Sequence, residues 1–262
     1  MKKIITTTTL LLNFCLIAQS KEDSIQFNKI STEILNNGKA YDELRDLTKN
    51  IGHRLSGSAA YEKSVQWAAQ QLRDAGADKV WLQEVMIPVW ERGKESLQIK
   101  TDTGKWKSLK MLSLGNSEGT GGKDVFGEII MVKSMDEYEK LPTEKVKDKI
   151  VFFNYPFSQS YIETFKGYSD AAKYRTTAAS LTAKKGGKFA IIRSLSSAFD
   201  DVPHTGAMRY QDDKKIPAVA IGSSVADELE NLLKSQKVVA KLNSNCGMKG
   251  EKLSHSVIGE IA

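Results

Sequence analysis

The sequence predicts an α/β fold in two parts: an α/β scaffold interrupted by an inserted, strand-rich domain. Two observations lead to this prediction. The first is a change of pattern: helical periodicity is prominent in residues 21–105, whereas short runs of β-branched and aromatic residues dominate 106–245. The second is that residues 246–262 resume an alternating pattern after the strand-rich block. We therefore expect 106–245 to be the insertion, flanked by two pieces of the scaffold.

The first scaffold piece begins with helices. Residues 22–36 and 40–50 form two expected short helices, and a Gly- and Ser-rich loop follows at 51–58. Ser58 is a suitable N-cap for the next helix, whose apolar residues recur at i, i+4, i+7 and i+8 until Gly76 ends it. Two strands are then expected, and these are 80–90 and 95–101.

The inserted block has a different composition. A glycine-rich stretch at 114–124 reads as a flexible connection, since Asp124 and Ser117 break the pattern of a phosphate-binding loop. The expected strands are 124–132, 149–157, 188–194, 216–222 and 238–243, and the expected helices are 168–185 and 224–235. After this block, 256–261 alternates like a strand and enters the scaffold again.

The N-terminus predicts a cleavable signal peptide over residues 1–20. A short basic start precedes an apolar, uncharged run, and Ala18 and Ser20 fit a small-x-small cleavage site. We therefore expect a secreted or periplasmic protein without a membrane anchor. Cys246 then remains as the only cysteine, which leaves no internal disulfide, and we interpret it as a small buried residue.

Composition argues against a nucleic-acid partner. The chain has 262 residues and a net charge of +6, but its acidic and basic residues are interspersed along the whole length. The densest basic patch, 184–188, contains no stacking aromatics. We expect an ordinary mixed-charge surface and no nucleic-acid binding.

Motifs for catalysis are missing from the sequence. There is no Gly-x-Ser-x-Gly elbow and no His-Glu-x-x-His, and the three histidines, His53, His204 and His255, are isolated. The spacing therefore predicts no catalytic residue and no metal ligand. His53 and Arg54 in the 51–58 loop are candidates for a pocket or interface.

The turn-forming stretch DDVPHTGAMRY supplies the other candidates for a pocket or interface. They are His204, Arg209 and Tyr210. A hydrogen-bonded structural role is the alternative for each histidine.

Six stretches in order resemble the secreted zinc exopeptidases of the carboxypeptidase Q family. They are IGHRLSGS, IPVWERGKES, YRTTAASLTAKKGGKFAIIRS, PHTGAMRY, IPAVAI and SHSVIGEI, and they cover the chain from about residue 40 to its end. The resemblance implies an α/β peptidase core interrupted by a protease-associated domain, which we place at 106–245. It also implies two zinc ions that activate water for the hydrolysis of short peptides.

The resemblance further implies that the zinc ligands and the general base follow the strand SHSVIGEI. We therefore expect this chain to be an N-terminal portion of an exopeptidase, truncated in the scaffold piece 246–262 and inactive alone. The alternative is a secreted binding module built on the protease-associated domain. The pattern leaves a homodimer and the exopeptidase polarity open.

Overall fold

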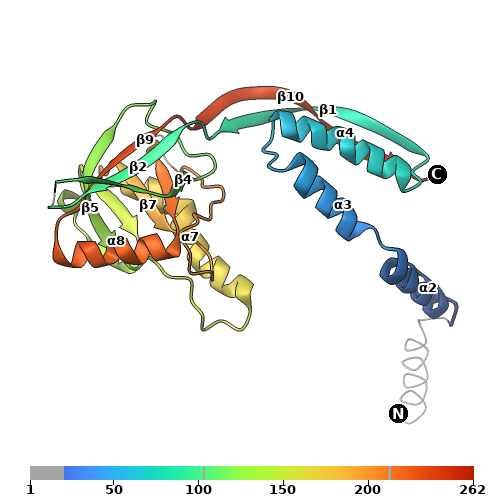
Figure 1. Cartoon of the computed structure of the whole chain (residues 1–262), viewed down its shortest axis with the longest axis horizontal. Helices are drawn as coiled ribbons and strands as arrows, with labels where there is room; N and C mark the ends of the chain where they lie inside the picture. The colour runs from blue at the N-terminus through green and yellow to red at the C-terminus, as the bar shows by residue number, and fades with distance from the viewer. Residues whose placement is uncertain (1–20, 103, 212–213) are drawn as a thin grey trace, which may run out of the picture. The chain divides into compact units, whose positions relative to one another are not determined.

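The computed structural model describes residues 21–102, 104–211 and 214–262, which divide into two units (Figure 1). Unit 1 comprises the described residues up to Arg54 together with Ala59–Leu82 and Val257–Ala262, and unit 2 comprises Leu55–Ser58 and Gln83–Ser256. The predicted signal peptide, 1–20, lies outside the described residues. No helix in the described part of the chain is long and apolar enough to span a membrane.

Unit 1 is built mainly from helices. These are α2 (Lys21–Asn37), α3 (Ala40–Asp46), the π-helical turn η1 (Leu47–Ile51) and α4 (Ala59–Asp74). The indole of Trp67 on α4 donates a 2.6 Å hydrogen bond to Asp46 on α3. Among the described residues of this unit, only Val65 and Ala69 are buried.

Two long strands carry the chain from one unit to the other. They are β1 (Lys79–Glu91) and β10 (Gly247–Glu260), which pair in a two-stranded sheet. The strand expected at 256–261 is therefore the end of a longer strand that has a partner in β1. At this end the N–H of Asp78 donates to Glu260 O at 2.9 Å.

Unit 2 is built on an eight-stranded sheet. Its strands are β2 (Glu95–Lys100), β3 (Trp106–Leu109), β4 (Met111–Ser113), β5 (Val125–Val132), β6 (Ile150–Phe153), β7 (Phe189–Arg193), β8 (Ala218–Ile221) and β9 (Val239–Ser244). The order is β3-β2-β9-β5-β6-β7-β8-β4, with β5 to β8 mutually parallel and the other pairings antiparallel. This mixed sheet confirms the predicted α/β class.

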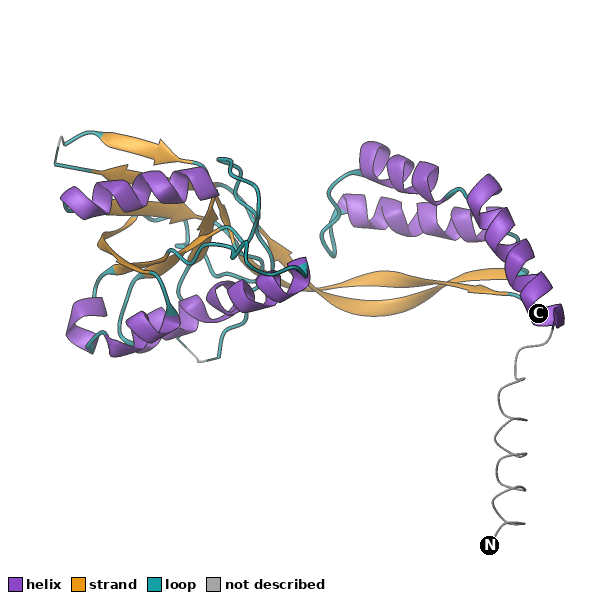
Figure 2. Ribbon diagram, turned by 90° about the horizontal axis from the view of Figure 1, so that it is seen from below, coloured by secondary structure: helices purple, strands orange, loops and turns teal. Residues whose placement is uncertain are grey.

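Helices cover both faces of this sheet (Figure 2). On one face α8 (Ser223–Ser235) packs through Ala226 and Leu229, and on the other lie α5 (Met135–Lys140), α6 (Thr143–Val146) and α7 (Thr164–Lys184). Strand β6 shows why helices must pack on both faces of the sheet, since its apolar side chains point to both sides. Ile150 and Phe152 belong to the α8-side core, whereas Val151 and Phe153 belong to the α7-side core.

The second unit begins earlier than the boundary expected at residue 106. Strand β2, which we had assigned to the scaffold, pairs with β9 from Glu95↔Ser244 to Lys100↔Val239. Leu97 and Ile99 enter the α8-side core because they alternate toward it. The unit therefore takes in 83–105 as well, and the assignment of this block as a protease-associated domain stays a prediction.

The glycine-rich stretch 114–124 is held firmly and is not a flexible connection. Ser117 is fully buried, and its hydroxyl accepts from the Ala218 N–H at 2.9 Å. Backbone bonds join Gly119 N to Cys246 O at 2.9 Å and Thr120 N to Ser244 O at 2.9 Å. These bonds tie the stretch to the end of β9 and leave Cys246 buried.

Candidate ligand pocket in the strand-rich unit

A pocket of about 330 Å³ lies in unit 2 where the loop before α4 meets the end of β1. Its lining residues all belong to this unit. They are Leu55, Ser56, Pro88, Trp90, Arg92, Gly115, Asn116, Thr205, Gly206 and Ala207. The walls are mostly apolar or backbone, and Arg92 is the only charged side chain among them.

The pocket brings together separate stretches of the sequence that carry the family resemblance. Leu55 comes from IGHRLSGS, Trp90 and Arg92 from IPVWERGKES, and Gly206 from PHTGAMRY. Arg175, in YRTTAASL, lies directly behind Gly206. Motifs that are weak one by one therefore converge in space, although nothing in their spacing predicted a shared site.

Trp90 and Arg92 form one wall because the end of β1 is anchored on both sides. The buried indole of Trp90 donates to Ser117 O at 2.8 Å. The guanidinium of Arg92 lies over the Trp90 ring, 5.2 Å from its centroid, and its Nη1 donates to Ser113 O. Stacking on an aromatic face and a carbonyl partner hold this cation in place while the rest of its fork stays available.

The opposite wall is the turn Thr205–Ala207, which lies along Gly115. The Gly115 N–H donates to Gly206 O at 3.0 Å, and the Met208 N–H donates to Gly115 O at 2.9 Å. A side chain at residue 206 would displace the guanidinium of Arg175. A Cβ there would lie 2.7 Å from the Cζ atom of Arg175, well inside van der Waals contact.

The arrangement is suited to ligand binding. Ser56 and Thr205 provide hydroxyls, but the lining contains no histidine, carboxylate or cysteine that could activate them. A fixed guanidinium beside apolar walls suits a small ligand that has an anionic oxygen and an apolar part.

The structure separates the residues predicted to line a pocket or an interface. His53 is exposed and Arg54 half-buried in unit 1, where the Arg54 Nη1 donates to Gly52 O at 2.7 Å. His204 is exposed, with its Nε2 3.9 Å from Asp200 Oδ1, and Arg209 is exposed as well. None of these residues lines the pocket, although the neighbours of His204 do.

The Tyr210 side chain connects two backbone segments of unit 2. Its phenol accepts from the Glu118 N–H at 2.9 Å and donates to Ile216 O at 2.6 Å. Burial raises the pKa of the Tyr210 phenol, so the group stays protonated and clamps the glycine-rich stretch.

Sequence reasoning did not identify Trp90, Arg92 or Asn116 as pocket residues. The signal that could have found Trp90 and Arg92 is the quoted stretch IPVWERGKES, in which an indole at the end of β1 is followed two positions later by a guanidinium just beyond the strand. That stretch was interpreted only as part of a resemblance.

Metal ligands do not come together in the structure. Within residues 21–102, 104–211 and 214–262, no three His, Cys, Asp or Glu side chains lie close enough to hold a metal ion. The residues present therefore do not fit the zinc centre that the resemblance implies, and no chemical step through zinc is assigned to them.

Comparison with known proteins identifies relatives. The chain is 33% identical to human carboxypeptidase Q over 225 residues, which is 85% of this chain and 45% of that protein. It is 30% identical to the mouse carboxypeptidase Q over 250 residues, or 92% of this chain and 51% of that protein. No family model matches the chain.

Solved structures agree with these relatives. A peptidase M28 precursor from Shewanella amazonensis superimposes with a TM-score of 0.80 at 29% identity, covering 88% of this chain and 52% of that one. A zinc aminopeptidase from Bacillus subtilis shares the fold, with a TM-score of 0.55 at 21% identity over 84% of this chain and 46% of its own.

The chain spans about half the length of the curated relatives it matches. The resemblance predicted from the six stretches is confirmed. Over most of its length the chain is therefore homologous to carboxypeptidase Q and has the fold of a peptidase M28.

Proposed function

We propose that the chain is an N-terminal portion of a secreted zinc exopeptidase that hydrolyses short peptides. The observation that supports this most is the extent of the similarity: carboxypeptidase Q sequences align with 85–92% of the chain at 30–33% identity. A peptidase M28 structure covers nearly the same part with a TM-score of 0.80. Secretion rests on the predicted signal peptide at 1–20.

The state of unit 1 supports the same proposal. Its described residues bury only Val65 and Ala69, and several large apolar side chains are exposed. On α2 alone, Ile30 is 55% and Leu35 is 82% exposed. An apolar layer of this kind lacks a hydrophobic cover, which the remaining half of a peptidase would provide.

We assign zinc binding and catalysis to the longer enzyme of which this chain would be the N-terminal portion, here called the parent, and not to this chain alone. The described residues bring no metal-ligand set together, and the pocket in unit 2 lacks a nucleophile with a base. In the parent, two zinc ions would polarise the scissile carbonyl and activate water, as metal-assisted hydrolysis requires. We therefore expect the chain alone to be inactive.

The test starts from the coding DNA beyond the codon for Ala262. The chain and the longest product of that reading frame are purified, and zinc content and hydrolysis of unblocked dipeptides are measured for both. We expect stoichiometric zinc and hydrolysis only in the longer product. Zinc bound with activity in the chain alone, or a longer product without either, would overturn the proposal.

A binding module remains the second candidate, because unit 2 has its own core on both faces of the sheet and its own pocket. The two candidates differ in what unit 1 does. A monodisperse chain in which both units melt together favours the module, whereas aggregation, or melting confined to unit 2, favours the missing cover.

A further inference from the structure

We propose that the pocket in unit 2 binds a free carboxylate attached to a small apolar group, with Arg92 as the anion-binding side chain. The ligand class is the C-terminal end of a short peptide or amino acid. That last identification rests on the proposed exopeptidase function, whereas the affinity for a carboxylate follows from the pocket itself.

The charge of the pocket is the first reason to expect an anionic ligand. Arg92 is half-buried and is the only charged residue in the lining. Within the described part of the chain no ion pair joins its guanidinium to a carboxylate, and its one hydrogen bond is from Nη1 to Ser113 O. A guanidinium has five N–H donors arranged in a fork that matches a carboxylate, so most of its capacity is unused.

Two charged residues outside the lining, Glu95 and Arg175, lie near the pocket. Glu95 does not line the pocket, and its Oε2 accepts from the Ser113 N–H at 3.1 Å, which engages one oxygen of that carboxylate. On the opposite wall the guanidinium of Arg175 lies against Gly206. Neither group lines the pocket, so Arg92 is the only charged side chain in its lining, and the lack of a carboxylate there favours an anion.

The size and the apolar lining of the pocket are the reason to expect a small ligand with an apolar part. A volume of about 330 Å³ is at the small end of ligand pockets and suits one or two amino-acid residues. Leu55, Pro88 and Trp90 are the large apolar residues of the lining, and Ser56 and Thr205 are its hydroxyl-bearing residues. An apolar side chain next to a carboxylate matches this division.

Fluorine NMR can test the site in the chain as it stands. The chain contains four tryptophans, which 5-fluorotryptophan labels as four signals that Trp→Phe variants assign. N-acetyl-leucine is titrated at pH 7 against N-acetyl-leucinamide, which has the same apolar part and no carboxylate. We expect the Trp90 signal to shift saturably with the acid, and the amide to bind about tenfold more weakly.

Arg92→Gln gives the matching variant. We expect it to weaken binding of the acid about tenfold and to leave binding of the amide unchanged, since only the acid uses the charge. Arg209→Gln removes an exposed arginine of the same unit that does not line the pocket, and it should change neither.

Three results would overturn the proposal: a Trp90 signal that the acid does not move, equal affinity for acid and amide, or an Arg92→Gln protein that folds and still prefers the acid. If Arg92→Gln does not fold, the acid-to-amide ratio of the unchanged chain decides the matter. Because the assay needs no catalysis, its failure is distinct from a failure of the exopeptidase proposal.

Discussion

Units 1 and 2 of this chain contain similar proportions of apolar residues but bury them to different degrees. In unit 2 alternate residues of β6, β7 and β8 enter two separate cores, and large side chains such as Phe152 and Phe153 are fully buried. In unit 1 the apolar face of α2 is open, and Phe27 is 59% exposed. Apolar side chains therefore form a core in unit 2, where a second layer covers them, and stay exposed on α2, where no described residue does.

Phe152→Ala gives the largest expected effect and tests the core of unit 2. Phe152 is fully buried at the centre of the sheet, so the substitution should lower the free energy of unfolding by about 3–5 kcal/mol. Urea unfolding followed by circular dichroism measures the change. Phe27→Ala, on the exposed face of α2, is the control and should have almost no effect; equal losses would show that unit 1 has a core of its own.

Gly119→Ala should have the next largest effect. A Cβ at this position would lie 2.6 Å from Ser244 O and 2.8 Å from Cys246 O, both backbone atoms that cannot move alone. We expect a loss of about 2 kcal/mol in urea unfolding. Ser96→Ala, on an exposed strand position of the same unit, should change little. A neutral Gly119→Ala would mean that the 114–124 stretch is less firmly held than its hydrogen bonds indicate.

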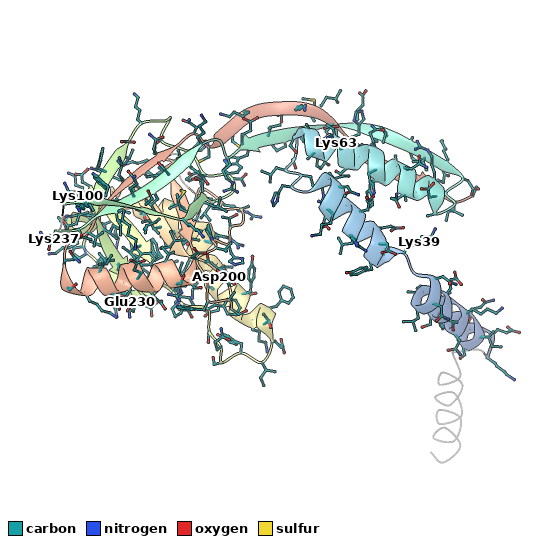
Figure 3. The ribbon with its side chains drawn as sticks, in the orientation of Figure 1. Lys39, Lys63, Lys100, Asp200, Glu230 and Lys237 are labelled. Carbon is teal, nitrogen blue, oxygen red and sulfur yellow. The ribbon has the colours of Figure 1, made fainter. Side chains whose placement is uncertain are left out.

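Glu230→Gln tests a polar network at the carboxyl ends of the parallel strands. Glu230, on α8 (Figure 3), accepts from Lys133 Nζ at 2.7 Å and from Asn154 Nδ2 at 2.6 Å. Hydrogen bonding from Lys133 lowers the pKa of Glu230 against the opposing effect of desolvation. A lowered carboxyl pKa adds stability above the pKa of the unfolded state, and this is lost as pH falls through the folded-state value. The variant should therefore lose about 1 kcal/mol at pH 7 and less at pH 3.

The measurement for Glu230 is urea unfolding at both pH values. Glu228→Gln removes an exposed carboxylate that pairs with Lys107 and should change stability by only about 0.5 kcal/mol. A Glu230→Gln penalty that grew toward low pH would contradict the sign of the pKa shift.

Ile30→Ser on α2 should have the smallest effect. Ile30 is 55% exposed and α2 buries no residue, so the chain alone should lose less than about 0.5 kcal/mol. In a longer product that covers this face, the same substitution should cost about 2 kcal/mol or more. Thermal unfolding of both proteins gives the comparison, and an equal small effect in both would show that α2 stays exposed.

The sequence was informative where pattern and burial agree. Strand β7 follows from the apolar run FAIIR, which is buried on both faces of the sheet, and helix α8 follows from the periodic Val225, Leu229 and Leu232, which pack one face of the helix. Helix α5 was not predicted, although Ser134 and Glu137 form a capping signature, and the Ser134 hydroxyl accepts from the Glu137 N–H at 3.1 Å. Six residues were too few for periodicity to show.

The pocket could not be predicted in the same way. Trp90, Gly115 and Gly206 are far apart in sequence, and the β-bridge between Gly115 and Ala207 that aligns two of its walls depends on tertiary packing. Residues with an obvious chemical identity, such as His53 and His204, drew attention instead. Their exposure shows that chemical identity without a placed neighbour is a weak guide to a site.

The pairing of β1 with β10 has a consequence for recombination of this chain. Since these strands are neighbours, the polypeptide enters the strand-rich unit and leaves it at adjacent points. A block whose two ends meet can be removed by one short splice, or inserted into a surface hairpin of another protein, without stretching either host. Residues 83–256, which make up all of unit 2 except Leu55–Ser58, can in this sense be transferred as one block by cutting within the paired strands.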